Sequence, residues 1–446
     1  MDARYLERFL SDAARGATRS EIRELLKLVA RPEIISLAGG MPAPETFPVD
    51  ELADLLGRAL REEGRSALQY GTTEGDAELK REILRFLVET EGDSYAGLTP
   101  DHLLVTSASQ QSLDLCSRTF LSPYDAVVVG LPSYLGALGA FRAAGARPIG
   151  VPADAEGLRS DLLEERLVEA RGRGIHPKLL YLVPDFANPT GETMGRTRRA
   201  EILAIARDFD LLVIEDSPYR LLRYSGETQP TLASLDRDGR VLALHSLSKI
   251  LAPGIRLGWL VAHPEIVARL VVMKQPVDLC TGGLQQLAAR VYLRAGGFAG
   301  HLERVRALYA RQLDVLLAAL ERHFDPAWGA RWTRPAGGLF AWIVLPPWMD
   351  ARTLLELAVR EYHVAFVVGD AFHADGSGRN TLRLNFSYAA PARLEEGVAR
   401  LARAIAHLVR EGRLRAEPGR GSASFVASDD AWLQATWRLA TAETHD

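Results

Sequence analysis

The feature that most constrains this chain of 446 residues is an alternation of short apolar runs with helical patterns in its middle part. Helical patterns such as Gln110–Phe120 and Thr197–Phe209 lie between most of the runs. Strands that alternate with helices predict a largely parallel α/β sheet, and runs this apolar suit strands that are buried on both faces. The six expected strands are Leu103–Thr106, Ala126–Gly130, Leu179–Val183, Leu211–Glu215, Val241–His245 and Leu257–Val261.

A different pattern follows Pro264. Long helical segments dominate to about His323, and alternating strands and helices come after them. This change predicts a second, smaller α+β domain, which the N-terminal segment with an expected helix at Ser20–Val29 joins. The later expected elements are strands at Gly338–Leu345 and Thr381–Phe386 and helices at Ala351–Tyr362 and Pro391–Leu408.

These patterns divide the chain into four expected parts. They are an N-terminal arm over residues 1–45, a large domain over 46–290, a small domain over 291–410 and a tail extension over 411–446. Within the tail, Asp429–Ala440 is either a short amphipathic helix that docks through Trp432 and Trp437 or part of a disordered tail, and two tryptophans are costly to leave in water.

Composition excludes several classes of function. The net charge of −4 provides no basic field for nucleic acid or for an anionic membrane, and no apolar run reaches the roughly 18 residues of a membrane helix. Met1–Ser20 lacks the apolar core of a secretory signal, and Cys116 and Cys280 cannot form a disulfide framework, so we expect a cytoplasmic protein. The ten histidines are scattered and no HExxH or GxxxxGK[ST] motif occurs, so we expect no metal site.

Lys249 points most directly to chemistry. The chain has only five lysines, and this one directly follows an apolar run, in the segment Ser246-Leu247-Ser248-Lys249. Lysine is a poor core residue, which favours a Schiff-base lysine at this position. Ser246, Ser248 and the later Arg256 offer hydroxyl donors and a planar cation, the groups that hold a phosphate.

Two further segments follow other apolar runs. Asp216 ends one of them, and an acid there can pair with a pyridinium nitrogen while Tyr219 donates to a ring oxygen; the alternative is an exposed turn acid. Asn188, in Asn188-Pro189-Thr190-Gly191, is read alone as part of a turn, whereas beside a cofactor its amide can bond the phenolic oxygen of the ring.

The last two segments are the expected start of a helix and an expected strand that contains an arginine. The small residues of Ser107–Gln111 leave backbone N–H groups free for a phosphate, although any serine-rich helix cap has a similar sequence. Arg383 lies inside an expected strand, where an unpaired guanidinium is costly. It either clamps a substrate carboxylate or belongs to a structural ion pair.

Taken together, these segments resemble the aspartate aminotransferase superfamily, the pyridoxal-phosphate enzymes of fold type I, class I/II. The resemblance extends from about Ser20 to Leu408 and is closest to the 2-aminoadipate, kynurenine and aromatic aminotransferase branch. It implies a large domain with a mostly parallel seven-stranded sheet flanked by helices, and a smaller α+β domain. The further segments that carry it are Ile22-Arg23-Glu24, Ser36–Pro42, Gln69-Tyr70-Gly71, Pro132-Ser133-Tyr134 and Arg334–Phe340.

The resemblance implies pyridoxal 5'-phosphate as the cofactor and a role for each matching residue. Lys249 forms the internal aldimine and shuttles protons, and Arg23 either recognises a distal substrate carboxylate or lies on a solvated helix face. The other roles are Asp216 on the pyridine nitrogen, Asn188 and Tyr219 on the phenolic oxygen, Tyr134 stacked on the ring, Ser109, Gln110, Ser246, Ser248 and Arg256 on the phosphate, and Arg383, Asn188 and the Gly40 backbone on the substrate α-carboxylate. Tyr70 reaches the phosphate of a neighbouring subunit, which implies a homodimer with shared active sites.

The activity implied is transfer of an amino group from an L-amino acid to a 2-oxo acid such as 2-oxoglutarate. Three departures concern the substrate: the paired glycines of Cys280-Thr281-Gly282-Gly283, which could enlarge the wall between subunits, Val367-Val368-Gly369 in place of the Val-Pro-Gly turn of relatives, and the long tail after Glu411. The paired glycines and the tail leave open an alternative, a pyridoxal-phosphate-dependent C–S β-lyase or a decarboxylative or oxidative deaminase. A transcription regulator with such a domain is not expected, because too few residues precede Gly39 to form a winged helix.

Overall fold

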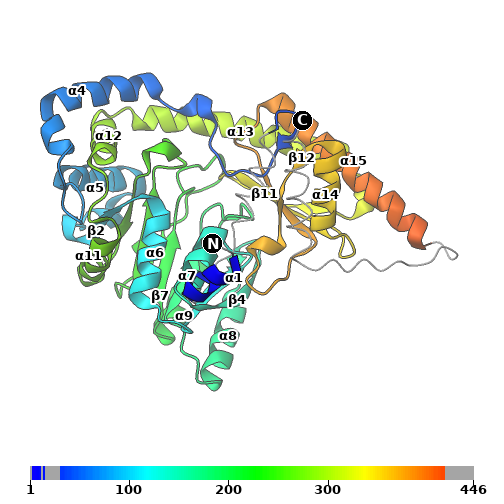
Figure 1. Ribbon diagram of the computed structural model, residues 1–446, viewed down its shortest axis with the longest axis horizontal. Coiled ribbons are helices and arrows are strands. Elements are labelled where there is room, and N and C mark those ends of the chain that lie inside the picture. Colours follow the sequence, from blue (N-terminus) through cyan, green and yellow to red (C-terminus); the bar gives the residue numbers. More distant parts are fainter. Residues whose placement is uncertain (1–2, 12–13, 16–30, 417–446) are drawn as a thin grey trace.

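A computed structural model describes residues 3–11, 14–15 and 31–416 (Figure 1). The expected helix at Ser20–Val29, with Arg23, and the tail segment Asp429–Ala440 lie outside the described residues. No helix within the described residues is long and apolar enough to cross a membrane.

An eight-stranded sheet forms the centre of the larger part of the molecule. Its strands are β2 (Leu103–Thr106), β3 (Ala126–Leu131), β4 (Arg147–Asp154), β5 (Gly157–Leu158), β6 (Leu179–Leu182), β7 (Leu212–Asp216), β8 (Val241–Ser246) and β9 (Gly258–Val261), in the order β2-β9-β8-β7-β6-β3-β4-β5. The neighbouring strands from β8 to β4 are parallel, whereas β9 runs antiparallel to β2 and β8 and β5 antiparallel to β4. The prediction of a mostly parallel α/β sheet is therefore confirmed.

All six strands expected from the sequence belong to this sheet, with bounds that differ by at most two residues. β4 was not predicted, because all of its residues except Val151 are exposed or half-buried and it has no continuous apolar run. The sheet has eight strands rather than seven because β4 turns back into the two-residue strand β5.

Helices cover both faces of this sheet. Alternate residues of β3 show why its apolar run is continuous: Val127 and Val129 pack in one cluster with residues of α6, α7 and α11, and Val128 packs in another with residues of α8 and α9. The helices of this part are α4 (Val49–Ala67), α5 (Ala77–Glu91), α6 (Ala108–Phe120), α7 (Leu135–Ala143), α8 (Ser160–Gly172), α9 (Arg196–Asp208), α10 (Leu232–Leu235), α11 (Pro264–Asp278) and α12 (Gly283–Arg294). A burial pattern of this kind is typical of a sheet between two helical layers.

The second part lies beyond the long helix α13 (Phe298–His323), to the right in Figure 1. Its antiparallel sheet has the order β10-β11-β14-β13, and helices α14 (Ala351–Tyr362) and α15 (Pro391–Ala416) pack beside it. The strands are β10 (Arg331–Trp332), β11 (Phe340–Val344), β13 (Val367–Val368) and β14 (Thr381–Asn385). The N-terminal strand β1 (Ile35–Ser36) pairs in parallel with β12 (Val364–Ala365), and the short helix α1 (Ala3–Leu6) precedes it in the chain. The domain boundaries given above stay predictions.

Candidate active site

A cavity of about 130 Å³ lies where the carboxyl ends of β2, β6, β7 and β8 meet. Ligands commonly bind at this edge of an open α/β sheet, because the loops that follow parallel strands gather there. The lining residues are Ala108, Ser109, Gln110, Tyr134, Val183, Asn188, Asp216, Pro218, Tyr219, Ser246, Ser248, Lys249, Pro253 and Arg256. The cavity thus brings together ten of the eleven residues that the sequence nominates for cofactor binding, and Tyr70 is the exception.

Lys249 lies three residues after the end of β8, and its Nζ donates a hydrogen bond to the carbonyl oxygen of Gly40 at 2.7 Å. Burial of the ammonium group, together with the nearby positive charges of Arg383 and Arg256, lowers the pKa of Lys249 to about 8. A larger fraction of this amine is therefore neutral near pH 7 than of an ordinary lysine, and the neutral amine is the nucleophilic form.

Asp216 is the last residue of β7 and is buried. Its Oδ2 accepts a hydrogen bond from the Tyr181 hydroxyl at 2.9 Å, and its Oδ1 has no partner among the described residues. Burial raises the pKa of Asp216 to about 7, and the bond from Tyr181 opposes that rise. A buried carboxylate oxygen without a donor fits a protonated ring nitrogen, which would supply both the N–H and the positive charge.

Arg383 comes from β14 of the second sheet and reaches the loop after β6. Its Nη1 donates to Asn188 Oδ1 at 2.7 Å and its Nη2 to the carbonyl oxygen of Ala38 at 2.6 Å. Its guanidinium lies 4.1 Å from the ring centre of Phe340 and 5.1 Å from that of Phe372. Its buried Nε has no partner among the described residues, so a donor is left for a ligand.

No carboxylate within the described ranges forms an ion pair with Arg383. Burial lowers the pKa of this guanidinium to about 10, so that it remains protonated at neutral pH. A buried cation without an anionic partner is costly, and a bound carboxylate would supply one. Of the two readings of Arg383 left open by the sequence, the geometry thus fits the substrate clamp better than the structural ion pair.

The opposite end of the cavity offers donors for a phosphate. The hydroxyl of Ser248 lies 2.9 Å from that of Ser246 and 3.5 Å from Nη1 of Arg256. Ser109 and Gln110 belong to the first turn of α6, where backbone N–H groups are unpaired by the helix. Hydroxyls, a guanidinium and a helix N-terminus together suit a dianionic phosphate.

The remaining residues that the sequence predicts for the site are Gly40, Tyr70 and Arg23. The Gly40 backbone lies at the site through its bond to Lys249, and a Cβ there would come within 3.0 Å of the Phe340 ring. Tyr70 follows α4, is 80% exposed and does not line the cavity. Arg23 lies outside the described residues.

Sequence reasoning missed Tyr181, the hydrogen-bond partner of Asp216. A signal existed, since a tyrosine in a buried strand needs a partner for its hydroxyl. The identity of that partner depends on the parallel register of β6 and β7, which places Tyr181 beside Ile214. Burial and the charge of Asp216 raise the pKa of Tyr181 well above its usual value, so this hydroxyl stays a donor.

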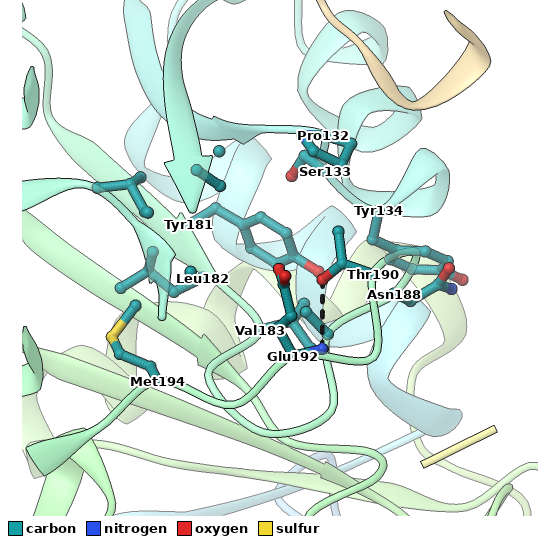
Figure 2. A pocket seen from close by; sticks show the side chains of 15 residues that line it. Pro132, Ser133, Tyr134, Tyr181, Leu182, Val183, Asn188, Thr190, Glu192 and Met194 are labelled. Carbon is teal, nitrogen blue, oxygen red and sulfur yellow. Dashed lines mark hydrogen bonds between the residues drawn. The ribbon is translucent and has the colours of Figure 1, made fainter. Parts of the chain in front are cut away.

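A second cavity, of about 50 Å³, adjoins the first, and Figure 2 shows it from close by. Tyr134, Val183 and Asn188 line both cavities, and Tyr181 and Glu192 line only the smaller one. Burial raises the pKa of Glu192 to about 7, although a hydrogen bond with Thr190 acts in the opposite direction and lowers it. The two cavities therefore share part of their wall.

The paired glycines have a local explanation. A Cβ on Gly283, the first residue of α12, would lie 2.1 Å from the carbonyl oxygen of Ala67 at the end of α4, so only glycine permits this close approach. A Cβ on Gly282 would meet the flexible side chain of Gln285. The pair therefore allows α12 and α4 of one chain to pack closely, and this packing accounts for Gly283 without an enlarged wall between subunits.

Comparison with known proteins agrees with this geometry. The family model for aminotransferase class I and II matches residues 32–401. The chain is 42% identical to aromatic-amino-acid aminotransferase 1 of Thermococcus litoralis over 90% of this chain and 94% of the relative, and 42% identical to 2-aminoadipate transaminase of Thermus thermophilus over 89% and 96%. The crystal structure of Pyrococcus horikoshii kynurenine aminotransferase, in complex with PMP, superimposes with a TM-score of 0.86 at 42% identity and covers 91% of this chain and 98% of that one.

This chain therefore belongs to the class I and II aminotransferases. It is a pyridoxal-phosphate-dependent transaminase of fold type I, which moves amino groups between amino acids and 2-oxo acids. The cofactor and the branch implied by the sequence motifs are both confirmed.

Proposed function

We propose that this chain holds pyridoxal phosphate in the 130 Å³ cavity through Lys249 and transfers the amino group of an L-amino acid with an aromatic or acidic side chain to 2-oxoglutarate. The observation that carries this proposal is that Lys249, Asp216 and Asn188 line one cavity from the ends of three strands, and that Arg383 of β14 donates a hydrogen bond to Asn188 beside it. The substrate class rests on the similarity to the aromatic and 2-aminoadipate enzymes.

When bound, the cofactor supplies an electron sink for the pair released at the substrate Cα. Asp216 would accept the N–H of the ring nitrogen on its Oδ1 and keep that nitrogen protonated. Tyr219 and Asn188, whose side chains lie 3.4 Å apart, would donate to the phenolic oxygen. Tyr134 would lie against the ring, and Ser109, Gln110, Ser246, Ser248 and Arg256 would hold the phosphate.

Arg383 binds the substrate α-carboxylate in this proposal. The Asn188 amide lies next to it and fixes the plane of the guanidinium, and the Gly40 backbone borders the same space. A carboxylate held by a planar fork leaves the Cα–H bond in one orientation, and such positioning contributes strongly to rate.

Lys249 moves the proton. With its pKa of about 8, the Nζ amine would take the proton from the substrate Cα, hold it on Nζ and give it back later in the transfer. Asp216 and Arg383 do not exchange protons in this step, because the first is held as an anion by the ring nitrogen and the second stays protonated.

We also propose that the active enzyme is a homodimer in the cytoplasm. Tyr70 is exposed in the single chain although it is a large aromatic residue, which supports a position against the phosphate site of a second copy. Cys116 and Cys280 are both free thiols, which suits a reducing compartment. Size-exclusion chromatography with light scattering tests the dimer, and its expected result is twice the chain mass of 48.9 kDa.

The deciding experiment for the reaction is a visible absorption spectrum of the purified protein with single amino acids and no 2-oxo acid. The panel comprises 2-aminoadipate, glutamate, aromatic and branched amino acids and an S-substituted cysteine. Conversion of the cofactor to its pyridoxamine form by an aromatic or acidic donor is the expected result, with Lys249→Ala as the control that shows no conversion. Release of thiol, ammonia or CO₂ without that conversion would instead assign the lyase or deaminase alternative.

A further inference from the structure

Six charged side chains form a buried cluster near the ends of β6 and β7, and none of them lines the cofactor cavity. The ionic cluster comprises Glu91, Asp185, Arg199, Glu215, Arg220 and Arg223. Asp185, Arg199 and Glu215 are fully buried, and the other three side chains are at most 12% exposed. Three carboxylates meet three guanidinium groups, so the formal charges cancel.

Asp185 lies at the centre of the ionic cluster. Its Oδ1 lies 2.9 Å from Nη2 of Arg199, and its Oδ2 lies 3.0 Å from Nη1 of Arg220. Arg223 approaches Oδ1 at 3.7 Å. Arg220 also pairs with Glu91 at 2.7 Å.

Arg199 closes the loop that carries Asn188. Its Nη2 donates to the carbonyl oxygen of Pro184 at 3.0 Å and its Nε to that of Met194 at 2.9 Å, and these two residues stand at either end of the loop. Arg199 Nη1 also lies 3.7 Å from Glu215 at the end of β7. One guanidinium therefore connects the loop of Asn188 with the strand of Asp216.

The members of the ionic cluster alternate with cofactor-site residues along the chain. Glu215 precedes Asp216, and Arg220 follows Tyr219. Because successive strand residues point to opposite faces, a shift of the cluster moves the residue on the other face. Glu215 in turn accepts the backbone N–H groups of residues 232 and 233 at 2.8 and 2.9 Å, which fixes the end of β7 against α10.

Stability alone does not account for such a cluster. Burying six charges costs desolvation, and apolar residues of similar volume often stabilise a protein as well or better. Directional bonds to backbone carbonyls and carboxylates do, however, specify one conformation, and binding sites need their groups held within about 0.5 Å.

We propose that Asp185 and Arg199 are positioning residues, which hold Asn188 and Asp216 in the geometry that the cofactor ring requires. This inference rests on the proposed function, because it takes Asn188 and Asp216 as the residues that contact the ring. Neither Asp185 nor Arg199 lines the cavity, so each acts through the loop or strand that it fixes.

The test variant is Asp185→Asn, which keeps the side-chain shape and removes the central charge. Its matched control is Arg290→Gln, since Arg290 is also buried and paired with two carboxylates, Glu63 at 2.6 Å and Asp76 at 3.5 Å, none of which lines the cavity. Three quantities are measured: the melting temperature of the apoprotein, the Kd for pyridoxal phosphate by fluorescence titration, and the pH midpoint of the visible absorbance of the loaded protein.

We expect both variants to lower the melting temperature. Only Asp185→Asn raises the cofactor Kd, by about tenfold, and moves the pH midpoint by about one unit, because a tenfold change in a charge-dependent interaction equals one pK unit. An Asp185→Asn protein with an altered melting temperature but an unchanged Kd and midpoint, as for Arg290→Gln, would overturn the inference.

Arg223→Gln keeps the inference testable if Asp185→Asn does not fold. Arg223 stands at the edge of the ionic cluster with a single 3.7 Å pair, so its loss is tolerated more easily, and we expect shifts of Kd and midpoint in the same direction but smaller. No shift in that variant, with Asp185→Asn unfolded, also counts against positioning. Asp216→Asn distinguishes failure of the proposed function from failure of the positioning role. If this variant leaves the pH midpoint unchanged, the proposed role of Asp216 is wrong. If it shifts the midpoint while Asp185→Asn does not, only the positioning role is wrong.

Discussion

The two sides of the loops after β6 and β7 differ in how their polar groups are satisfied. On the cofactor side, Asp216 Oδ1 and Arg383 Nε are buried without a partner among the described residues. On the side of the ionic cluster, both oxygens of Asp185 and both of Glu215 have donors, and of the cluster's side chains only Arg223 has a buried nitrogen without a partner.

The buried polar atoms on the cofactor side therefore lack partners until a ligand binds, whereas the carboxylates of the ionic cluster already have donors within the protein. Buried polar atoms without partners are costly, so the cofactor side is unfavourable until a ligand binds. The ionic cluster offsets its desolvation cost through its ion pairs and through hydrogen bonds to backbone groups around it. We therefore expect substitutions on the cofactor side to change activity with little loss of stability, and substitutions in the ionic cluster to change stability first.

The largest expected effect is that of Lys249→Ala. Loss of the proton-transferring amine should lower kcat by about 10⁴-fold, at the upper end of what a general acid–base group contributes. The apoprotein should be no less stable, because the Nζ has no carboxylate partner in the described part of the chain and its pKa is already lowered by burial. Steady-state kinetics and urea unfolding of the apoprotein measure the two quantities, and a large loss of stability would contradict the distinction between the two sides.

Arg199→Met tests how much the ionic cluster contributes to stability. It leaves Asp185 and Glu215 buried with one guanidinium fewer, and removal of one partner from a buried ion pair costs about 3–5 kcal/mol. The free energy of unfolding of the apoprotein in urea should fall by that amount. Arg166→Met, which removes an exposed pair with Glu169, is the control, and we expect less than about 1 kcal/mol there.

The sequence predicted the cofactor side well because each of its residues follows an apolar run. Lys249, Asp216 and Asn188 all stand at strand ends, and parallel strands bring their carboxyl ends to one edge. Local chain order is therefore enough to predict that these residues meet. The same reasoning gave six strands of the central sheet but not β4, whose residues are half exposed.

The ionic cluster could not be predicted in this way. Arg220 and Glu91 are 129 residues apart, and neither lies in a motif. Asp185 occupies a segment that resembles a polar turn, and Arg199 is one of many arginines on helical patterns. Their pairing depends on how α5 and α9 pack, which no local pattern specifies. Gly283 is similar, since its need for glycine comes from a carbonyl in α4.

Arg383→Lys is a narrower test of the cofactor side. Lysine keeps the charge but has no planar fork, and it cannot donate to Asn188 and to a carboxylate in the same plane. We expect kcat/KM for the amino donor to fall by about 10²-fold, equal to about 2.7 kcal/mol, with most of the change in KM. The cofactor Kd should stay unchanged, because the phosphate and ring contacts are intact. A changed cofactor Kd with an unchanged KM would contradict the carboxylate role.

The smallest expected effect concerns His245 on β8, whose neighbour Ser246 lines the cofactor cavity. Its ring stacks on Trp259 at 5.5 Å, and its Nε2 has no partner among the described residues. Burial, with a contribution from the charge of Arg220, lowers the pKa of His245 to about 3. The unfolded chain therefore takes up a proton near pH 6.5 that the folded chain does not, so stability falls as the pH drops below 6.5.

Between pH 7 and pH 5.5 this single group should cost about 1.3 kcal/mol of unfolding free energy. His245→Phe removes the titrating group and retains a ring beside Trp259, so the variant should lose that much less stability over the same interval. Urea unfolding of both apoproteins at the two pH values measures the difference, and all other titrating groups cancel in the subtraction. Equal losses in the two proteins would mean that His245 can be protonated in the folded state and that water reaches its buried ring.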